Sequence, residues 1–158
     1  MTVSGGGSAM KPLRILVVED DWLLALDLKT MLERRGHEVV GTAADDTEAL
    51  VAALQTSPDL AFVDVNLRDG PSGASISSAG GRETKTPVVF VTANPEAIPG
   101  DFACALGAIE KPWRPEVIDE VLHFIDRYRT DPMTQPPSRM ILPPSLRGPS
   151  HFSRATAA

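Results

Sequence analysis

Residues 13–21 read LRILVVEDD. A mostly branched apolar run, Leu13 to Val18, is followed directly by three acidic residues. A short apolar run without polar alternation predicts a strand that is buried on both faces, which is typical of parallel sheets. Because the acids begin where the strand ends, we expect negative charge at the carboxyl edge of that sheet.

Outward from this strand, apolar runs alternate with helical patterns. Leu24, Leu28 and Leu32 recur at spacing four and predict a helix over 22–35, which Gly36 ends. Asp45 or Asp46 can cap a second helix with an inner face of Leu50, Ala53 and Leu54. A last helix is expected over 113–129. Further strands are predicted at residues 38–43, 60–63, 87–91 and 107–110.

Two stretches are poor helix material. Residues 72–85 are rich in glycine and serine, and 94–100 contain Pro95 and Pro99. We therefore expect about five helices, of which the third and the fourth are short or irregular. Strands that alternate with helices predict an α/β fold, a doubly wound parallel sheet covered on both faces.

Composition divides the chain into three parts. Residues 1–10 contain a Gly-rich run and are expected to be a flexible leader or an expression remnant. The alternating pattern occupies 11–129. Residues 130–158 are punctuated by prolines without an apolar period, and we expect them to be disordered.

Charge and composition narrow the class of protein. The formal net charge of −6 provides no overall basic field for nucleic acid or an anionic membrane. No apolar run approaches the roughly 20 residues that span a bilayer. Cys104 is the only cysteine, so the chain cannot form an internal disulfide. We expect a cytoplasmic protein.

Chemically active side chains gather at the predicted strand ends, where parallel sheets bind ligands. The first strand ends in Glu19, Asp20 and Asp21, the third in Asp64, the fourth in Thr92 and the fifth before Lys111. Taken singly, these residues have plainer roles: Asp20 or Asp21 as a helix N-cap, Thr92 as a strand former. It is their coincidence at one edge that indicates a site.

This set suits phosphoryl transfer. If the first and third strands are adjacent, about 4.8 Å apart, Asp20 and Asp64 repel one another unless a cation intervenes. Mg²⁺ prefers such oxygen ligands, and the carbonyl of Asn66 can add another. Asp64 would then be the nucleophile, while Lys111 and Thr92 would contact phosphoryl oxygens.

Four motifs in order resemble the receiver domains of two-component signalling: ILVVEDD, FVDVNLRDGPSG, PVVFVTA and EKPW, within Leu13 to about Arg129. The resemblance implies a flavodoxin-like five-stranded sheet of order 2-1-3-4-5 and a cis Lys111–Pro112 bond. It also implies that Asp64 is the phosphoacceptor, with Thr92 and Lys111 beside it. The implied Mg²⁺ site consists of Glu19, Asp20, Asp64 and Asn66.

Some positions depart from typical receivers. Ala108 stands where an aromatic switch residue is usual, and the third and fourth helices are weak. With the stretch FVTANP, these features resemble the proteobacterial subgroup called FATGUY receivers. We expect phosphorylation to order residues 94–102 instead of rotating an aromatic ring.

The resemblance implies a single-domain response regulator and not an enzyme with a separate substrate. It would take its phosphoryl group from a sensor histidine kinase or a phosphotransfer protein, and switch a surface that binds an effector protein, as a monomer or a phosphorylation-dependent dimer. One alternative is a pseudo-receiver that only binds a partner. The other is a haloacid-dehalogenase-type phosphatase, although Glu19 and Asp20 precede the nucleophile here and no cap domain is evident.

Overall fold

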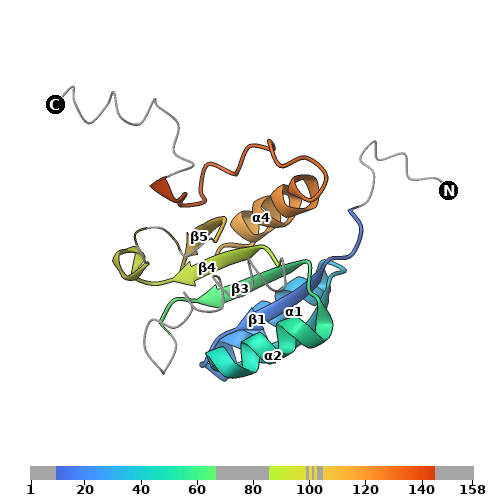
Figure 1. Cartoon of the computed structure of the whole chain (residues 1–158), viewed down its shortest axis with the longest axis vertical. Helices are drawn as coiled ribbons and strands as arrows, with labels where there is room; N and C mark the ends of the chain where they lie inside the picture. Colours follow the sequence, from blue (N-terminus) through green and yellow to red (C-terminus); the bar gives the residue numbers. More distant parts are fainter. Residues whose placement is uncertain (1–9, 67–85, 99, 101, 103–104, 145–158) are drawn as a thin grey trace.

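The computed structural model describes residues 10–66, 86–98, 100, 102 and 105–144. A parallel sheet of five strands forms its centre: β1 (Arg14–Val18), β2 (Glu38–Ala43), β3 (Leu60–Asp64), β4 (Val88–Thr92) and β5 (Gly107–Glu110). The strand order is β2-β1-β3-β4-β5, and every neighbouring pair is parallel (Figure 1). The predicted α/β class and strand order are confirmed.

In the described ranges, α1 (Trp22–Arg34), α2 (Asp46–Thr56) and the 3₁₀ turn η2 (Pro95–Ala97) lie between strands, and α4 (Pro115–Tyr128) follows β5. The weak helix expected in 72–85 lies outside the described residues. At the predicted fourth helix, Pro95 begins a single turn that ends at Ala97, as the prolines there suggested. Ordering of 94–102 on phosphorylation stays a prediction.

Alternate residues of the buried strands face two apolar layers. Ile15 and Val17 pack in the layer that contains α1 and α4, whereas Leu16 and Val18 pack in the layer that contains α2. This period of two is what a strand covered on both faces requires. The first motif therefore places β1 in the middle of the protein.

The helix starts follow their capping residues. Asp45 accepts a hydrogen bond from the Glu48 N–H (2.8 Å), and the Glu48 carboxylate accepts one from the Ala44 N–H (2.9 Å). This arrangement resembles a reciprocal capping box and satisfies N–H groups at the start of α2. The alternative of Asp45 or Asp46 as cap is thereby resolved in favour of Asp45.

The inner face of α2 differs from its predicted face. Ala49 and Ala53 are the buried residues of this helix, whereas Leu54 is 52% exposed. A side chain at Gly41 of β2 would lie 3.9 Å from the Cβ of Ala52, so the helix packs through short side chains. The expectation for Leu54 was wrong because small residues, not the leucines, permit the close helix–strand approach.

The stretch after α4 returns to the edge of the sheet and lies beside β5. Met140 is 5% exposed and belongs to the core cluster, and Ile141 forms a backbone bridge with Ala108 of β5. The division of the chain into leader, domain and tail stays a prediction. Within the tail, however, residues 140–142 differ from the expected disorder, because apolar side chains that lack periodicity still find a place beside β5.

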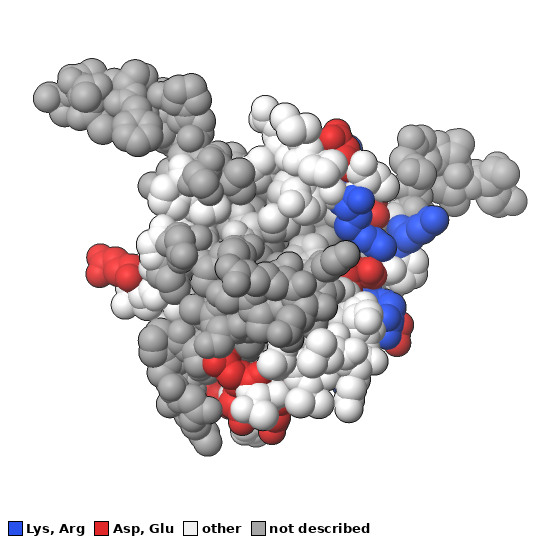
Figure 2. All heavy atoms as spheres, in the orientation of Figure 1, with Lys and Arg blue, Asp and Glu red and all other residues white. Residues whose placement is uncertain are grey.

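The visible surface carries charges of both signs. On the face shown in Figure 2, the blue Lys and Arg side chains gather at the right with red Asp and Glu side chains beside them, and further red groups lie apart from them at the bottom and at the left. Among the described helices, none is long and apolar enough to cross a membrane.

Candidate functional site

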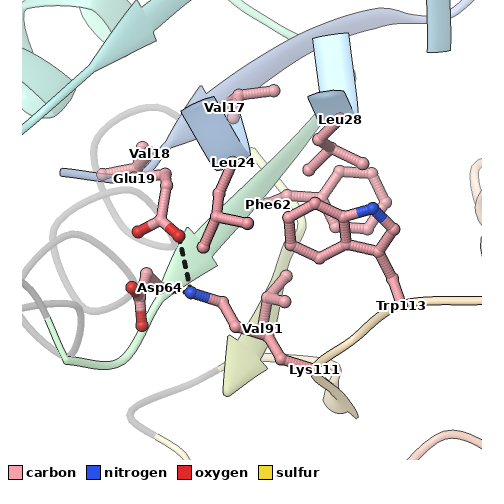
Figure 3. A pocket seen from close by; sticks show the side chains of 10 residues that line it. All are labelled: Val17, Val18, Glu19, Leu24, Leu28, Phe62, Asp64, Val91, Lys111 and Trp113. Carbon is pink, nitrogen blue, oxygen red and sulfur yellow. Dashed lines mark hydrogen bonds and ion pairs between the residues drawn. The ribbon is translucent and has the colours of Figure 1, made fainter. Parts of the chain in front are cut away.

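The carboxyl ends of β1 and β3 bring two acids together. Val18 is in register with Val63, so Glu19 and Asp64 follow at the same edge of the sheet. Both side chains are buried, and both point toward Lys111 in Figure 3. Parallel strands converge in this way because their carboxyl ends share one edge.

Lys111 connects these two acids. Its Nζ lies 2.5 Å from Glu19 Oε1 and 3.0 Å from Asp64 Oδ2 (Figure 3). The Lys111 N–H donates to the Thr92 carbonyl (2.8 Å), which fixes the residue at the end of β5 beside β4. The Lys111–Pro112 peptide bond is cis, as the family resemblance implied.

The ionisation of the three groups is linked. Burial raises the pKa of Glu19 to about 8, and the neighbouring Asp64 adds to this effect, while Lys111 opposes it. Burial also raises the pKa of Asp64, but hydrogen bonds from Glu19, the Asn66 N–H and Lys111 outweigh it and leave that pKa below its usual value. Burial lowers the pKa of Lys111, but both carboxylates raise it overall. Asp64 is thus held as the anion that a nucleophile must be.

The acidic side chains have the geometry of a cation site. Glu19, Asp20 and Asp64 each place a carboxylate oxygen within 4.8 Å of the others. Glu19 Oε2 is buried and has no hydrogen-bond partner among the described residues. An unpartnered buried carboxylate oxygen is costly unless it is paired or bound to a metal. The donor set, all oxygen and mostly charged, fits Mg²⁺.

Asp21 and Asp20 have separate positions. The Asp21 side chain accepts hydrogen bonds from the N–H groups of Leu23 (3.0 Å) and Leu24 (3.4 Å) and caps α1. It is therefore Asp21 that is committed to the helix start, whereas Asp20 lies with the acidic cluster. Sequence reasoning had left the capping role open between the two.

Asn66 also lies beside Asp64. Its backbone N–H donates to Asp64 Oδ1 at 2.8 Å, which orients the carboxylate. The predicted role of the Asn66 carbonyl as a metal ligand stays a prediction.

Thr92 is fully buried at the end of β4. Its hydroxyl donates to the Asn94 carbonyl and accepts from the Asn94 N–H, both at 2.9 Å. In the part of the chain that the structure describes, this hydroxyl is engaged with the following loop and forms no hydrogen bond with Asp64 or Lys111. The structure thus brings Glu19, Asp20, Asp64, Asn66 and Lys111 together and holds the Thr92 hydroxyl in a local turn.

Trp113 is a neighbour of the site that sequence reasoning missed. With Leu28 and Phe62, it lines a small cavity of about 10 Å³ next to Lys111 (Figure 3). Its indole N–H donates to Asp27 Oδ2 of α1 at 3.2 Å. In the sequence, only the position of Trp113 two residues after Lys111 could have indicated a place near the site. An isolated Trp at the start of a helix otherwise indicates a packing role alone.

Comparisons with known proteins identify the family of this chain. The model of the family described as "Response regulator receiver domain" matches residues 15–123. The phyllosphere-induced regulator PhyR of Methylorubrum extorquens is 36% identical over 110 residues, which is 68% of this chain and 41% of PhyR. The chain thus spans less than half the length of that relative.

Solved structures give the same result. The response regulator PhyR from Brucella abortus superposes with a TM-score of 0.65 at 31% identity, covering 78% of this chain and 53% of that one. The receiver domain of PhyR from Erythrobacter litoralis, a solution NMR structure, has a TM-score of 0.65 at 27% identity. It covers 83% of this chain and 98% of that one.

Proposed function

Because the chain belongs to the response regulator receiver family, a family of two-component signalling, we propose that it accepts a phosphoryl group on Asp64. The donor would be a sensor histidine kinase or a phosphotransfer protein, and the cofactor would be Mg²⁺. The single observation that supports this most is the position of Lys111. Its ammonium lies within hydrogen-bond distance of both Glu19 and Asp64, at an edge where Glu19 Oε2 is unpartnered among the described residues.

The acidic residues would hold the cofactor. Glu19, Asp20 and Asp64 would supply carboxylate oxygens, and Asn66 its carbonyl. Bound Mg²⁺ would offset the repulsion between the attacking carboxylate and the phosphoryl oxygens. This leaves the protein with the tasks of positioning and charge compensation, which dominate phosphoryl transfer.

The chain's own groups define the covalent step. An Asp64 oxygen forms a bond to phosphorus, while the bond between phosphorus and the donor breaks and its electron pair stays with the donor. The Asn66 N–H, which donates to Asp64 Oδ1, holds the carboxylate in place. Lys111, now 3.0 Å from Asp64 Oδ2, can follow the new negative charge to a phosphoryl oxygen.

The decisive experiment is phosphorylation in vitro. The full chain is incubated with acetyl phosphate and MgCl₂, and intact mass is measured for the wild type and for Asp64→Asn. Asp27→Asn is the matched control, since Asp27 is exposed on α1 and bonds Trp113 instead of the acidic cluster. We expect one phosphoryl group on the wild type and on the control, and none on Asp64→Asn.

The same assay separates the alternatives. Equal labelling of Asp64→Asn would reject the assignment, and failure of the wild type to label in the presence of Mg²⁺ would favour a pseudo-receiver. Repeated turnover of p-nitrophenyl phosphate would favour a phosphatase.

Signalling also requires an output. The solved relative from Bartonella quintana is described as an anti-anti-sigma factor, at 29% identity over 77% of this chain. We infer that this chain too acts by contact with an effector protein, without assigning that protein's identity. Its acidic charge of −6 favours a protein over nucleic acid as the partner.

A further inference from the structure

Residues 140–142, which come after α4 in the chain, cover the outer edge of β5. The Ala108 N–H donates to the Ile141 carbonyl, and the Ile141 N–H donates to the Ala108 carbonyl, both at 2.8 Å. The two residues form an antiparallel bridge, whereas the five strands of the sheet are all parallel. Residues 140–142 therefore occupy the place of a sixth strand (Figure 1).

The side chains of this segment alternate as those of a strand do. Met140 and Leu142 pack against the apolar layer that contains α4. Ile141 packs against the opposite layer, which contains Ala108. Alternation across the two layers shows that the segment continues the pleat of the sheet and does not merely lie on its surface.

Gly107 permits this close approach. A Cβ at Gly107 would lie 2.6 Å from Met140 Sδ and 2.8 Å from the Ile141 carbonyl oxygen, closer than real Cβ atoms come. A larger residue on β5 would therefore displace the segment. The absence of a side chain at Gly107 thus leaves the space that Met140 fills.

Two hydrogen bonds, both with Ala108, join the backbone of the segment to β5. One residue pair joins it to β5, whereas β4 and β5 share a register of four pairs. The preceding stretch packs loosely: a hollow of about 320 Å³ lies between it and α4, lined by His123, Phe124 and Pro137 among others.

We propose that the outer edge of β5 is a strand-addition site for an extended apolar peptide of a partner protein, and that residues 140–142 hold this site closed in cis. Extended peptides gain affinity from backbone hydrogen bonds at a sheet edge and specificity from alternate side chains. Residues 140–142, which now occupy the site, indicate the chemistry of the partner peptide. It should place a flexible apolar side chain over Gly107, followed by two branched aliphatic residues. This inference does not depend on phosphoryl transfer.

The test releases the segment in the full chain. Ile141→Pro removes the N–H that donates to Ala108, and its ring cannot replace that donor. Met133→Ala is the control, because Met133 lies in the same stretch but is 85% exposed. Circular dichroism and a melting curve establish that each variant is folded.

Two readouts are expected to change together. Hydrogen exchange of the Ala108 amide should accelerate in Ile141→Pro and not in Met133→Ala. A fluorescent synthetic peptide of residues 137–144 should bind Ile141→Pro at least about tenfold more tightly than the wild type, because the tethered segment competes at high effective concentration in the wild type. Gly107→Ala, added to Ile141→Pro, should abolish peptide binding.

Other outcomes contradict the proposal. Absence of peptide binding to a folded Ile141→Pro with an unprotected Ala108 amide would overturn it, as would binding that Gly107→Ala leaves intact. If the released variant forms dimers and ignores the peptide, the edge belongs to a second copy of the chain and the hetero-partner assignment is wrong.

Discussion

Lys111 Nζ lies 3.0 Å from Asp64 Oδ2, although the two residues are 47 positions apart in the chain. The same ammonium contacts Glu19 Oε1, so one cation contacts two buried acidic side chains. Charges in such a position depend on one another, because an unpaired buried charge costs far more than a paired one. The consequences of changing any member of this group can therefore be predicted.

Lys111→Met should destabilise the protein in the absence of metal. Asp64, whose pKa lies below its usual value, would lose its cation, and breaking a buried ion pair costs about 3–5 kcal/mol. Urea unfolding in EDTA measures the change, and added MgCl₂ should recover part of it.

Lys29→Met is the matched control, since Lys29 lies 3.7 Å from Glu33 with both side chains more than 40% exposed. Its effect should stay within about 0.5 kcal/mol. Equal losses in the two variants would show that Lys111 does not compensate the carboxylates.

Mg²⁺ binding should require Asp20 but not Asp21. Asp20→Asn removes one charged oxygen from the cluster, and we expect at least about a tenfold weaker affinity, equivalent to about 1.4 kcal/mol. Asp21→Asn should preserve both the helix cap and the affinity, because Asn caps helices as well as Asp does. Tryptophan fluorescence during a MgCl₂ titration measures the Mg²⁺ affinity of each variant. Similar weakening in the two variants would place the ion elsewhere.

Much of the fold was predictable because the pattern of β1 is strict. A run that is apolar on both faces, followed by Glu19 and Asp20, predicts a central parallel strand and an acidic edge, and both were found. The strand order required the resemblance of four motifs, since periodicity gives no information about which strands are neighbours.

The parts that the sequence did not reveal depend on tertiary packing. Met140 can pack against β5 only because Gly107, on a strand distant in the sequence, lacks a side chain. The local bond of the Thr92 hydroxyl with Asn94 likewise depends on the loop's conformation. The proline-rich composition of the tail does not predict the contact of Met140 with β5. The position of Thr92 at a strand end identifies its hydroxyl as a candidate phosphoryl-binding group, but does not predict its hydrogen-bond partner.

Thr92→Val should cost about 1–2 kcal/mol of unfolding free energy, even without phosphorylation. The Asn94 N–H and carbonyl would each lose a partner, and each such hydrogen bond contributes roughly 0.5–1.5 kcal/mol. Thr92→Ser keeps the hydroxyl and should lose clearly less. Urea unfolding, together with hydrogen exchange of the Asn94 amide, measures the difference. Indistinguishable variants would mean that the hydroxyl does not stabilise this turn.

His37 should make stability fall at mildly acidic pH. This buried side chain accepts a hydrogen bond from the Leu13 N–H through Nδ1 (3.0 Å), which requires the neutral ring. Burial lowers its pKa from the usual 6.5, with Arg35 adding to the effect and Asp119 and Asp126 opposing it. The unfolded chain therefore takes up a proton near pH 6.5 while the folded protein does not.

The sign of the effect follows from this difference. Unfolding is favoured as pH falls below 6.5, until the folded protein's own lower pKa is reached. His37→Asn, whose Oδ1 can replace Nδ1 as acceptor, should remove this part of the pH dependence. His123→Asn, at an exposed position on α4, removes only the smallest contribution to the low pKa of His37 and should keep most of this pH dependence. Unfolding free energies at pH 7.5 and pH 5.5 are measured for the wild type and for His37→Asn, so that the contribution of Glu19, which is present in both, cancels. An equal pH dependence in the two proteins would exclude a contribution from His37.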